Sequence, residues 1–268
     1  MRLLCEASET AKCEALFYAR LKTVTPLPAP RCLFCDYSEA SGEFVLLSAV
    51  VPYGGKDGRT SILPAKHRVR DVTTLEEQRC YVAAGAALNA ALWGADHPSL
   101  QGMPRYEATH VGLWSLAQLM GRLGLRRTVR RDLGAGENTG GFMTWEPPPE
   151  LVGREADLIS DLPALLGSLC RDRPGLVAYG HNDIVADNAF LWRDGAGGLS
   201  VGLFDWQQAC VNNLGQEYAW NFHFLPPEFL TAHEEELIDL LLSTWAAYGR
   251  PVDKAAFLEC YALGSLQM

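Results

Sequence analysis

The stretch that decides the fold reads Val177-Ala-Tyr-Gly-His181-Asn-Asp183-Ile-Val-Ala-Asp187-Asn188-Ala-Phe-Leu-Trp192, followed by Val201-Gly-Leu-Phe-Asp205-Trp206. The apolar run before His181 is typical of a short buried strand. Residues 189–192 and 199–204 have the same character and flank a glycine-rich turn, which predicts a β-hairpin. Because a hairpin brings its two ends together, we expect Asn188, which enters it, and Asp205, which leaves it, to face one cation.

The polar side chains of this stretch are spaced as in phosphotransferases. An aspartate placed like Asp183 can accept the proton of an attacking hydroxyl, while an asparagine and a later aspartate can hold magnesium against nucleotide phosphates. Asn188 and Asp205 offer the hard oxygen ligands that magnesium prefers over zinc. The alternative is that His181, Asp183 and Asn188 only cap a loop. The strands on both sides and the Asp205-Trp206 pair favour the functional interpretation.

These motifs resemble those of the aminoglycoside phosphotransferase and choline kinase superfamily, and the resemblance is strongest to its ecdysteroid-kinase-like branch. Three further stretches support it: Glu14-Ala-Leu-Phe17-Tyr18 is similar to the branch's helix C, Phe44-Val-Leu-Leu47 to the strand before the hinge between lobes, and Leu88-Asn-Ala-Ala-Leu-Trp93-Gly94 to a helix end. The resemblance covers residues 10–265 and is strongest at 176–220.

The resemblance implies an α+β, protein-kinase-like bilobal fold. Residues 1–51 would form a partial, truncated N-terminal lobe, with a helix C-like helix and a hairpin, and residues 52–268 a mostly helical C-terminal catalytic lobe. The implied activity is transfer of a phosphoryl group from ATP, with Mg²⁺, to a hydroxyl of a small molecule. The sequence does not identify that acceptor, nor the oligomeric state.

The same resemblance assigns roles to five residues. Asp183 would be the catalytic base and His181 would support its loop. Asn188 and Asp205 would bind magnesium and, through it, the nucleotide. Glu14 would be the helix C glutamate of the nucleotide site.

One part of the family pattern is missing. Phosphotransferases of this type pair the helix C glutamate with a strand lysine and cover the phosphates with a glycine-rich loop. Only 13 residues precede Glu14, none of them is glycine, and Lys12 lies on the same predicted helix. We therefore expect a kinase that could be inactive in this truncated form. The alternatives are a non-catalytic, pseudokinase-like binding module and a gene-model fragment.

Several residues near the motif carry an open interpretation. Asp187 is expected to be a loop or cap residue, although it could assist the reaction. Trp206 and Gln207 could border the acceptor pocket, and an apolar anchor is an equal alternative for Trp206. Glu217, in Gly215-Gln-Glu217-Tyr-Ala219, falls where the family has an aspartate, and we expect it to be structural.

Periodicity and capping signals predict the remaining elements. Thr73-Thr74-Leu-Glu76-Glu77 is read as a capping box that opens a helix ending at Trp93-Gly94. The face of that helix predicted to be buried consists of Tyr81, Ala84, Leu88 and Leu92. The other expected elements are helices over 6–22, 111–133, 160–171, 216–223, 232–248 and 253–268 and strands over 31–37 and 44–51, with Ser160, Thr231 and Asp253 as helix caps.

Composition limits the classes of partner. The net charge of −9 argues against nucleic acid, and no apolar run is long enough to span a membrane. The eight cysteines without a secretory signal indicate reduced thiols in a cytoplasmic protein. Cys32 and Cys35 lie in a predicted strand, where we expect them to face opposite sides, so a zinc site is not expected.

Overall fold

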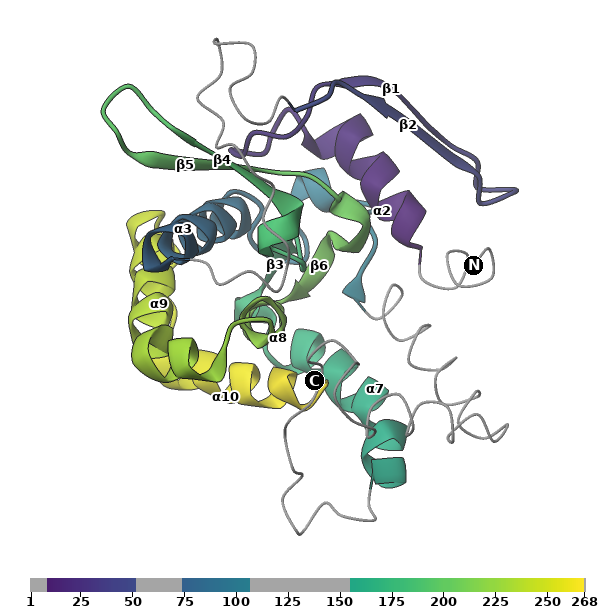
Figure 1. Cartoon of the computed structure of the whole chain (residues 1–268). Helices are drawn as coiled ribbons and strands as arrows, with labels where there is room; N and C mark the ends of the chain where they lie inside the picture. Colours follow the sequence, from purple (N-terminus) through teal and green to yellow (C-terminus); the bar gives the residue numbers. More distant parts are fainter. Residues whose placement is uncertain (1–8, 52–73, 107–154, 268) are drawn as a thin grey trace, which may run out of the picture.

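The computed structural model describes residues 9–51, 74–106 and 155–267, and its elements make an α+β fold (Figure 1). The expectations for residues 52–73 and 107–154, including a helix over 111–133, lie outside the described residues. Strands in the described part pair in three two-stranded antiparallel sheets, β1–β2, β3–β6 and β4–β5. The α+β class predicted from the sequence is therefore confirmed.

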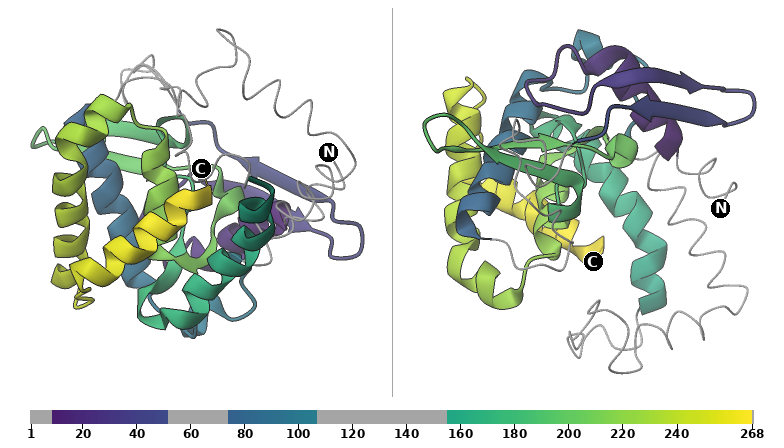
Figure 2. Two further views of the ribbon diagram at one scale, coloured as in Figure 1. Left: turned by 90° about the horizontal axis from the view of Figure 1, so that it is seen from below. Right: turned by 45° about the horizontal axis from the view of Figure 1, so that its top comes forward.

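The N-terminal part is a helix packed beneath a hairpin. Helix α2 (Thr10–Leu16) continues as a π-helical turn (Phe17–Leu21), inside the predicted helix. Strands β1 (Cys32–Tyr37) and β2 (Phe44–Ser48) form the predicted hairpin, which packs against α2 (Figure 1 and Figure 2). Helix α2 therefore lies between the hairpin and the turn at Trp206–Gln208, and its residue Glu14 contacts that turn.

Helix α3 (Leu75–Ala91) begins at a capping box: Thr74 and Glu77 bond each other's backbone N–H. The reciprocal bonds satisfy two donors that a helix start otherwise leaves unpaired. The predicted buried face is confirmed, since its four members, Tyr81, Ala84, Leu88 and Leu92, are at most 7% exposed. Helix α3 packs against α9 (Pro227–Ala247).

The centre of the fold carries the motif residues. Strand β3 (Val177–Gly180) pairs with β6 (Cys210–Asn213), and β4 (Ala189–Arg193) pairs with β5 (Leu199–Leu203). Two short 3₁₀ turns, Ala186–Asn188 and Trp206–Gln208, stand at the start and just beyond the end of the β4–β5 hairpin. Helix α8 (Leu214–His223) follows β6 at once, capped by Asn213. The sequence therefore predicted the strand and the hairpin correctly.

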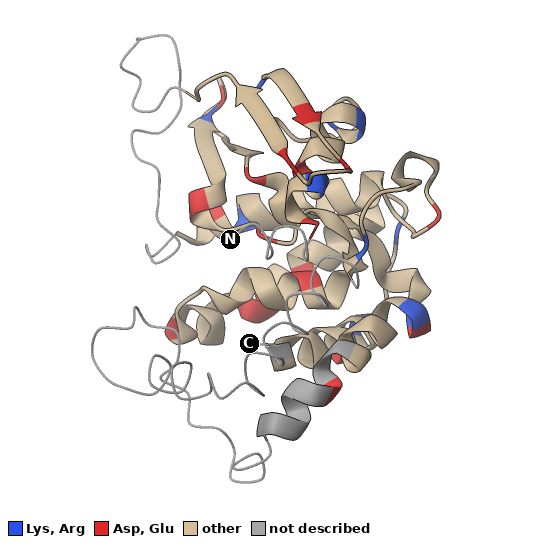
Figure 3. Ribbon diagram, turned by 90° about the vertical axis from the view of Figure 1, so that its right-hand side faces the viewer, with Lys and Arg blue, Asp and Glu red and all other residues tan. Residues whose placement is uncertain are grey.

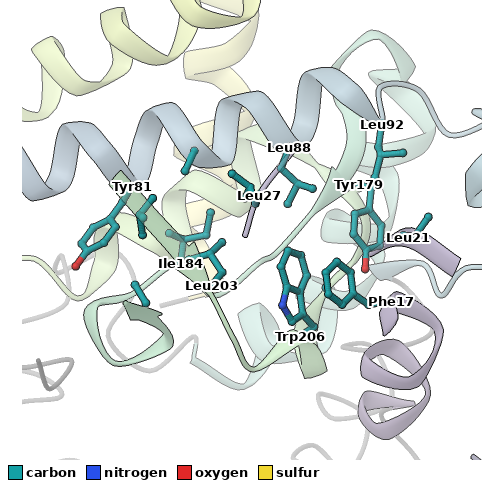
Figure 4. Close-up of a cluster of buried hydrophobic side chains, with 14 of the residues drawn as sticks. Phe17, Leu21, Leu27, Tyr81, Leu88, Leu92, Tyr179, Ile184, Leu203 and Trp206 are labelled. Carbon is teal, nitrogen blue, oxygen red and sulfur yellow. The ribbon is translucent and has the colours of Figure 1, made fainter. Parts of the chain in front are cut away.

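A buried apolar cluster joins α2, α3 and the central strands (Figure 4). Phe17 of the π-helical turn stacks on Trp206 with ring centroids 3.5 Å apart and planes 6° apart. Trp206 is fully buried in this cluster, as expected for an apolar anchor. The stack attaches α2 directly to the turn that follows Asp205.

Two helix starts differ from the sequence prediction. Helix α7 spans Glu155–Asp172, so Ser160 lies inside it and is not its cap. Helix α9 begins at Pro227, a favoured first position because proline lacks an N–H there. The Thr231 hydroxyl donates to the Pro227 carbonyl within α9, so it is not a cap either.

The C-terminal helix matches its predicted start. Asp253 caps α10 (Lys254–Gly264) by accepting a bond from the Ala256 N–H at 2.8 Å. A 3₁₀ turn, Ser265–Gln267, follows.

Exposed ion pairs connect neighbouring elements, and acidic and basic positions are spread along the described ribbon (Figure 3). Arg193 of β4 pairs with Glu76 of α3 at 2.8 Å, and Lys254 of α10 pairs with Asp239 of α9 at 2.7 Å. Pairs this exposed stabilise a fold only slightly. None of the helices in the described ranges is long and apolar enough to cross a membrane.

Candidate active site

The loop after β3 is held in place by Asn182. Its backbone has a positive φ of 57°, a conformation that asparagine tolerates better than most residues. Its side-chain N–H₂ donates to the Gly180 carbonyl at 3.1 Å, and its oxygen accepts from Asn212 at 2.8 Å. The turn that carries His181 and Asp183 is thereby bonded to β3 and to β6.

Glu217 of α8 supports the same loop from the other side. Its carboxylate accepts from the backbone N–H of Asn182 at 3.3 Å and from the Asn89 amide at 3.0 Å. Burial raises the pKa of Glu217 to about 7, and these hydrogen bonds act in the opposite direction. Gly180 is required here, because a Cβ on it would overlap the Glu217 carboxylate.

His181 is fully buried and connects this loop to the end of the β4–β5 hairpin. Its Nε2–H donates to the Phe204 carbonyl at 3.2 Å, which fixes the tautomer because a carbonyl only accepts. Burial lowers the pKa of His181 to about 4, so the ring is neutral near pH 7. This geometry suits a residue that supports the loop.

Asp183 lies at the centre of the site and accepts three side-chain hydrogen bonds. Asn188 donates to its Oδ2 at 2.8 Å, Gln208 to Oδ2 at 3.2 Å and the Trp220 indole to Oδ1 at 3.0 Å. Burial raises its pKa to about 6; the charges of Asp205 and Asp187 act in the same direction, against the bonds from Trp220 and Asn188. A half-buried carboxylate whose ionised form is further disfavoured by neighbouring negative charges is a candidate general base.

The two expected metal ligands stand at the two ends of the hairpin, as the sequence predicts. The Phe204 N–H donates to the Asn188 carbonyl at 3.1 Å, which joins the start of β4 to the residue before Asp205. The Asn188 amide nitrogen donates to Asp183, so its oxygen remains for another partner. Asp205 is exposed and has a left-handed backbone, with a φ of 65°. Such strain in a non-glycine residue is most often found at functional sites.

Glu14 reaches this site from α2. It is 6% exposed and accepts a long hydrogen bond, 3.4 Å, from the Trp206 backbone N–H. Burial raises its pKa, and the charge of Asp205 acts in the same direction. Within the part of the chain that the structure describes, no cation pairs with this carboxylate.

Two residues that hydrogen-bond to Asp183 were not identified from the sequence: Gln208 and Trp220. Gln208 lies one position beyond Gln207, which is exposed, and Trp220 lies in α8, 37 residues from Asp183. No local motif marks either residue, because both contacts depend on the pairing of β3 with β6. Asp187, half-buried in the 3₁₀ turn before β4, acts on Asp183 through its charge.

The prediction that Cys32 and Cys35 face opposite sides of a strand is wrong. A β-bulge between Cys32 and Phe34 shifts the register, so Leu33 and Phe34 are both exposed and both cysteines are half-buried. The Cys35 thiol points to the Ala15 carbonyl of α2. Among the described residues, no three His, Cys, Asp or Glu side chains are grouped so that they could hold a metal ion.

The fold is similar to that of solved aminoglycoside phosphotransferases over nearly the whole chain. A crystal structure of aminoglycoside-3'-phosphotransferase of type VIII is 19% identical with a TM-score of 0.50, covering 98% of this chain and 82% of that one. Aminoglycoside phosphotransferase APH(3'')-Id from Streptomyces rimosus, whose structure with ADP and streptomycin is known, is 17% identical with a TM-score of 0.51, covering 98% and 84%. No protein-family model and no curated protein sequence matches this chain. At these identities the likeness establishes the fold alone.

Proposed function

We propose that this chain transfers the terminal phosphoryl group of ATP to a hydroxyl of a small molecule, with Mg²⁺. The observation that carries the proposal is that Asn188 and Asp205 flank one hairpin, while Asp183, in the loop before it, accepts a hydrogen bond from Asn188. The proposal includes the division into a partial N-terminal lobe, 1–51, and a catalytic lobe, 52–268. It also includes the assignment to the ecdysteroid-kinase-like branch, which rests on the sequence motifs.

The residues present fit a magnesium site. Asn188 has its amide oxygen free of the bonds to Asp183, and Asp205 contributes an exposed carboxylate. Magnesium usually takes one or two protein oxygens and completes its shell with water and substrate phosphates. When bound, the ion would neutralise charge on the phosphates of ATP.

The protein's part in the reaction is to position the acceptor and to take its proton. The acceptor O–H would hydrogen-bond to the Asp183 carboxylate and give its proton to that group as the oxygen forms its bond to phosphorus. The bond from phosphorus to the bridging oxygen breaks, and ADP leaves with that electron pair. Because the transition state is loose, holding the hydroxyl in line matters at least as much as the basicity of Asp183.

One observation favours the second candidate, a non-catalytic binding module. Glu14 is buried beside Asp205 and has no cationic partner in the described part of the chain. Kinases of this kind rely on a lysine at that glutamate to hold the nucleotide phosphates. Without such a group, the site would bind a nucleotide weakly and turn it over slowly or not at all.

The test is a screen of the purified chain with Mg²⁺ and ATP against amino alcohols, aminoglycosides and sugars, with phosphorylated products detected by mass spectrometry. We expect one acceptor class to gain a phosphate in the wild type. Asp239→Asn, which changes an exposed carboxylate of α9 that pairs with Lys254 of α10, should keep the activity. Nucleotide binding without any product would favour the binding module.

A further inference from the structure

The hydrogen bonds of Asp183 come from three different elements. Asn188 is in the 3₁₀ turn before β4, Gln208 in the turn after Asp205, and Trp220 in helix α8. All three donors are neutral, so they orient the carboxylate without neutralising it. Two of them share Oδ2, and Trp220 alone bonds to Oδ1, at 3.0 Å.

This distribution distinguishes the two oxygens of Asp183. A carboxylate oxygen has about two lone-pair positions, so Oδ2, with two donors, has none left. Oδ1 receives only the Trp220 N–H and keeps one position. An acceptor hydroxyl can therefore bond to Oδ1 without displacing an existing bond.

The Trp220 side chain is itself fixed. Its ring packs edge-on against Phe224, with centroids 5.4 Å apart, and its plane makes an angle of 29° with the His223 ring, whose centroid is 6.3 Å away. Helix α8, which carries it, is capped by Asn213 and is buried along most of its length. An indole N–H only donates, so Trp220 can neither take the acceptor's proton nor bind a metal ion. Any effect of Trp220 on the reaction must therefore act through Asp183 or through packing.

We propose that Trp220 is a positioning residue: its indole N–H holds the Asp183 carboxylate so that the remaining position of Oδ1 faces the acceptor hydroxyl. This role rests on the proposed phosphoryl transfer. It predicts that the N–H matters for the chemical step, while binding of ATP, which depends on other residues, does not need it.

The experiment compares Trp220→Phe, which keeps an aromatic ring and loses the N–H, with Trp192→Phe. Trp192 is half-buried on β4 and stacks on Phe190, making no contact with Asp183, so it is a matched control. Trp220→Phe should lower kcat about 10- to 100-fold, as misplacement of a catalytic group does, with KM for ATP and the unfolding midpoint unchanged. Trp192→Phe should leave kcat unchanged.

A second measurement does not need activity. In ¹⁵N-tryptophan-labelled protein, the Trp220 indole N–H resonance, identified by its loss in Trp220→Phe, should move upfield in Asp183→Asn, since a neutral acceptor replaces a charged one. The Trp192 resonance should not move. An unchanged Trp220 resonance, or turnover that Trp220→Phe leaves unaltered, would overturn the role of Trp220 alone. A wild-type chain without turnover for any acceptor would overturn the proposed function together with this role.

Discussion

At the scale of single residues, Asp183 and His181 lie two positions apart and differ in protonation. His181 is fully buried and Asp183 half-buried, and the pKa of Asp183 rises to about 6 while that of His181 falls to about 4. Burial disfavours the charged form in each case, which is the carboxylate for Asp183 and the imidazolium for His181. Near pH 7 the loop therefore offers one charged base and one neutral hydrogen-bond donor, the division of labour that the proposed reaction needs.

The first prediction concerns Asp183→Asn. The variant keeps the shape of the side chain and removes the base, so kcat for the acceptor found in the screen should fall by about 10²- to 10⁴-fold. The affinity for ATP should change little, because Asn188 and Asp205 remain. Steady-state kinetics with varied ATP and acceptor separates the two effects. Asp183 would lose its role as base if the variant retained full kcat.

At the scale of elements, the site depends on how closely β3 approaches α8. The end of β3 has no side chain at Gly180, and this lets the Glu217 carboxylate reach the backbone N–H of Asn182. The loop that carries Asp183 is thus positioned by a helix that starts more than 30 residues later in the sequence.

The second prediction follows from that close approach. Gly180→Ala should lower the free energy of unfolding by about 1–3 kcal/mol, because its methyl group would overlap a buried carboxylate. Gly195→Ala is the matched control, since nothing lies within 4 Å of a Cβ at that turn position. Urea denaturation of the two variants measures the difference. Equal stabilities would show that β3 and α8 are less tightly packed than described.

The third prediction concerns Glu217→Gln and pH. The pKa of Glu217 is raised from 4.5 to about 7 in the folded chain, so the folded state binds this proton more tightly than the unfolded state does. The stability that the carboxyl contributes is complete below pH 4.5 and is lost as the pH rises through 7. Glutamine does not titrate. The free energy of unfolding of Glu217→Gln should therefore rise relative to the wild type by about 3 kcal/mol between pH 4.5 and pH 8.

Chemical denaturation at both pH values tests this, with Glu228→Gln, which changes an exposed carboxyl in α9, as the control. A difference between Glu217→Gln and the wild type that stays constant with pH would mean that Glu217 does not titrate in this range. Burial of Glu217 would then not raise the pKa of its carboxyl group as described.

At the scale of the whole molecule, the features that depend on local sequence patterns were predicted better than those that depend on long-range contacts. The strand before His181, the β4–β5 hairpin and the buried face of α3 follow from periodicity and turn residues, which are visible in a short window. The meeting of Asn188 with the end of β5 was predictable for the same reason, since a hairpin joins its own ends. The catalytic roles themselves remain predictions.

What the sequence could not provide depends on packing between distant elements. Trp220 meets Asp183 only because α8 follows β6, which pairs with β3. The bulge that places Cys32 and Cys35 on the same half-buried side breaks the simple alternation of a strand. The early start of α9 at Pro227 was missed because Thr231 offered a stronger capping signal than a proline at the first position.

The central claim is that Asn188 and Asp205 form a magnesium-dependent nucleotide site beside Asp183. The measurement that tests it most directly, without knowledge of the acceptor, is the thermal shift caused by ATP with and without Mg²⁺. Asp205→Asn is the informative variant, because asparagine tolerates the left-handed backbone of this position, with its φ of 65°, better than alanine does.

We expect a shift with ATP and Mg²⁺ in the wild type, in Asp183→Asn and in Asp187→Asn. In Asp205→Asn the part of the shift that depends on Mg²⁺ should disappear. Equal Mg²⁺-dependent shifts in Asp205→Asn and the wild type, or no shift with ATP in any of these proteins, would contradict it.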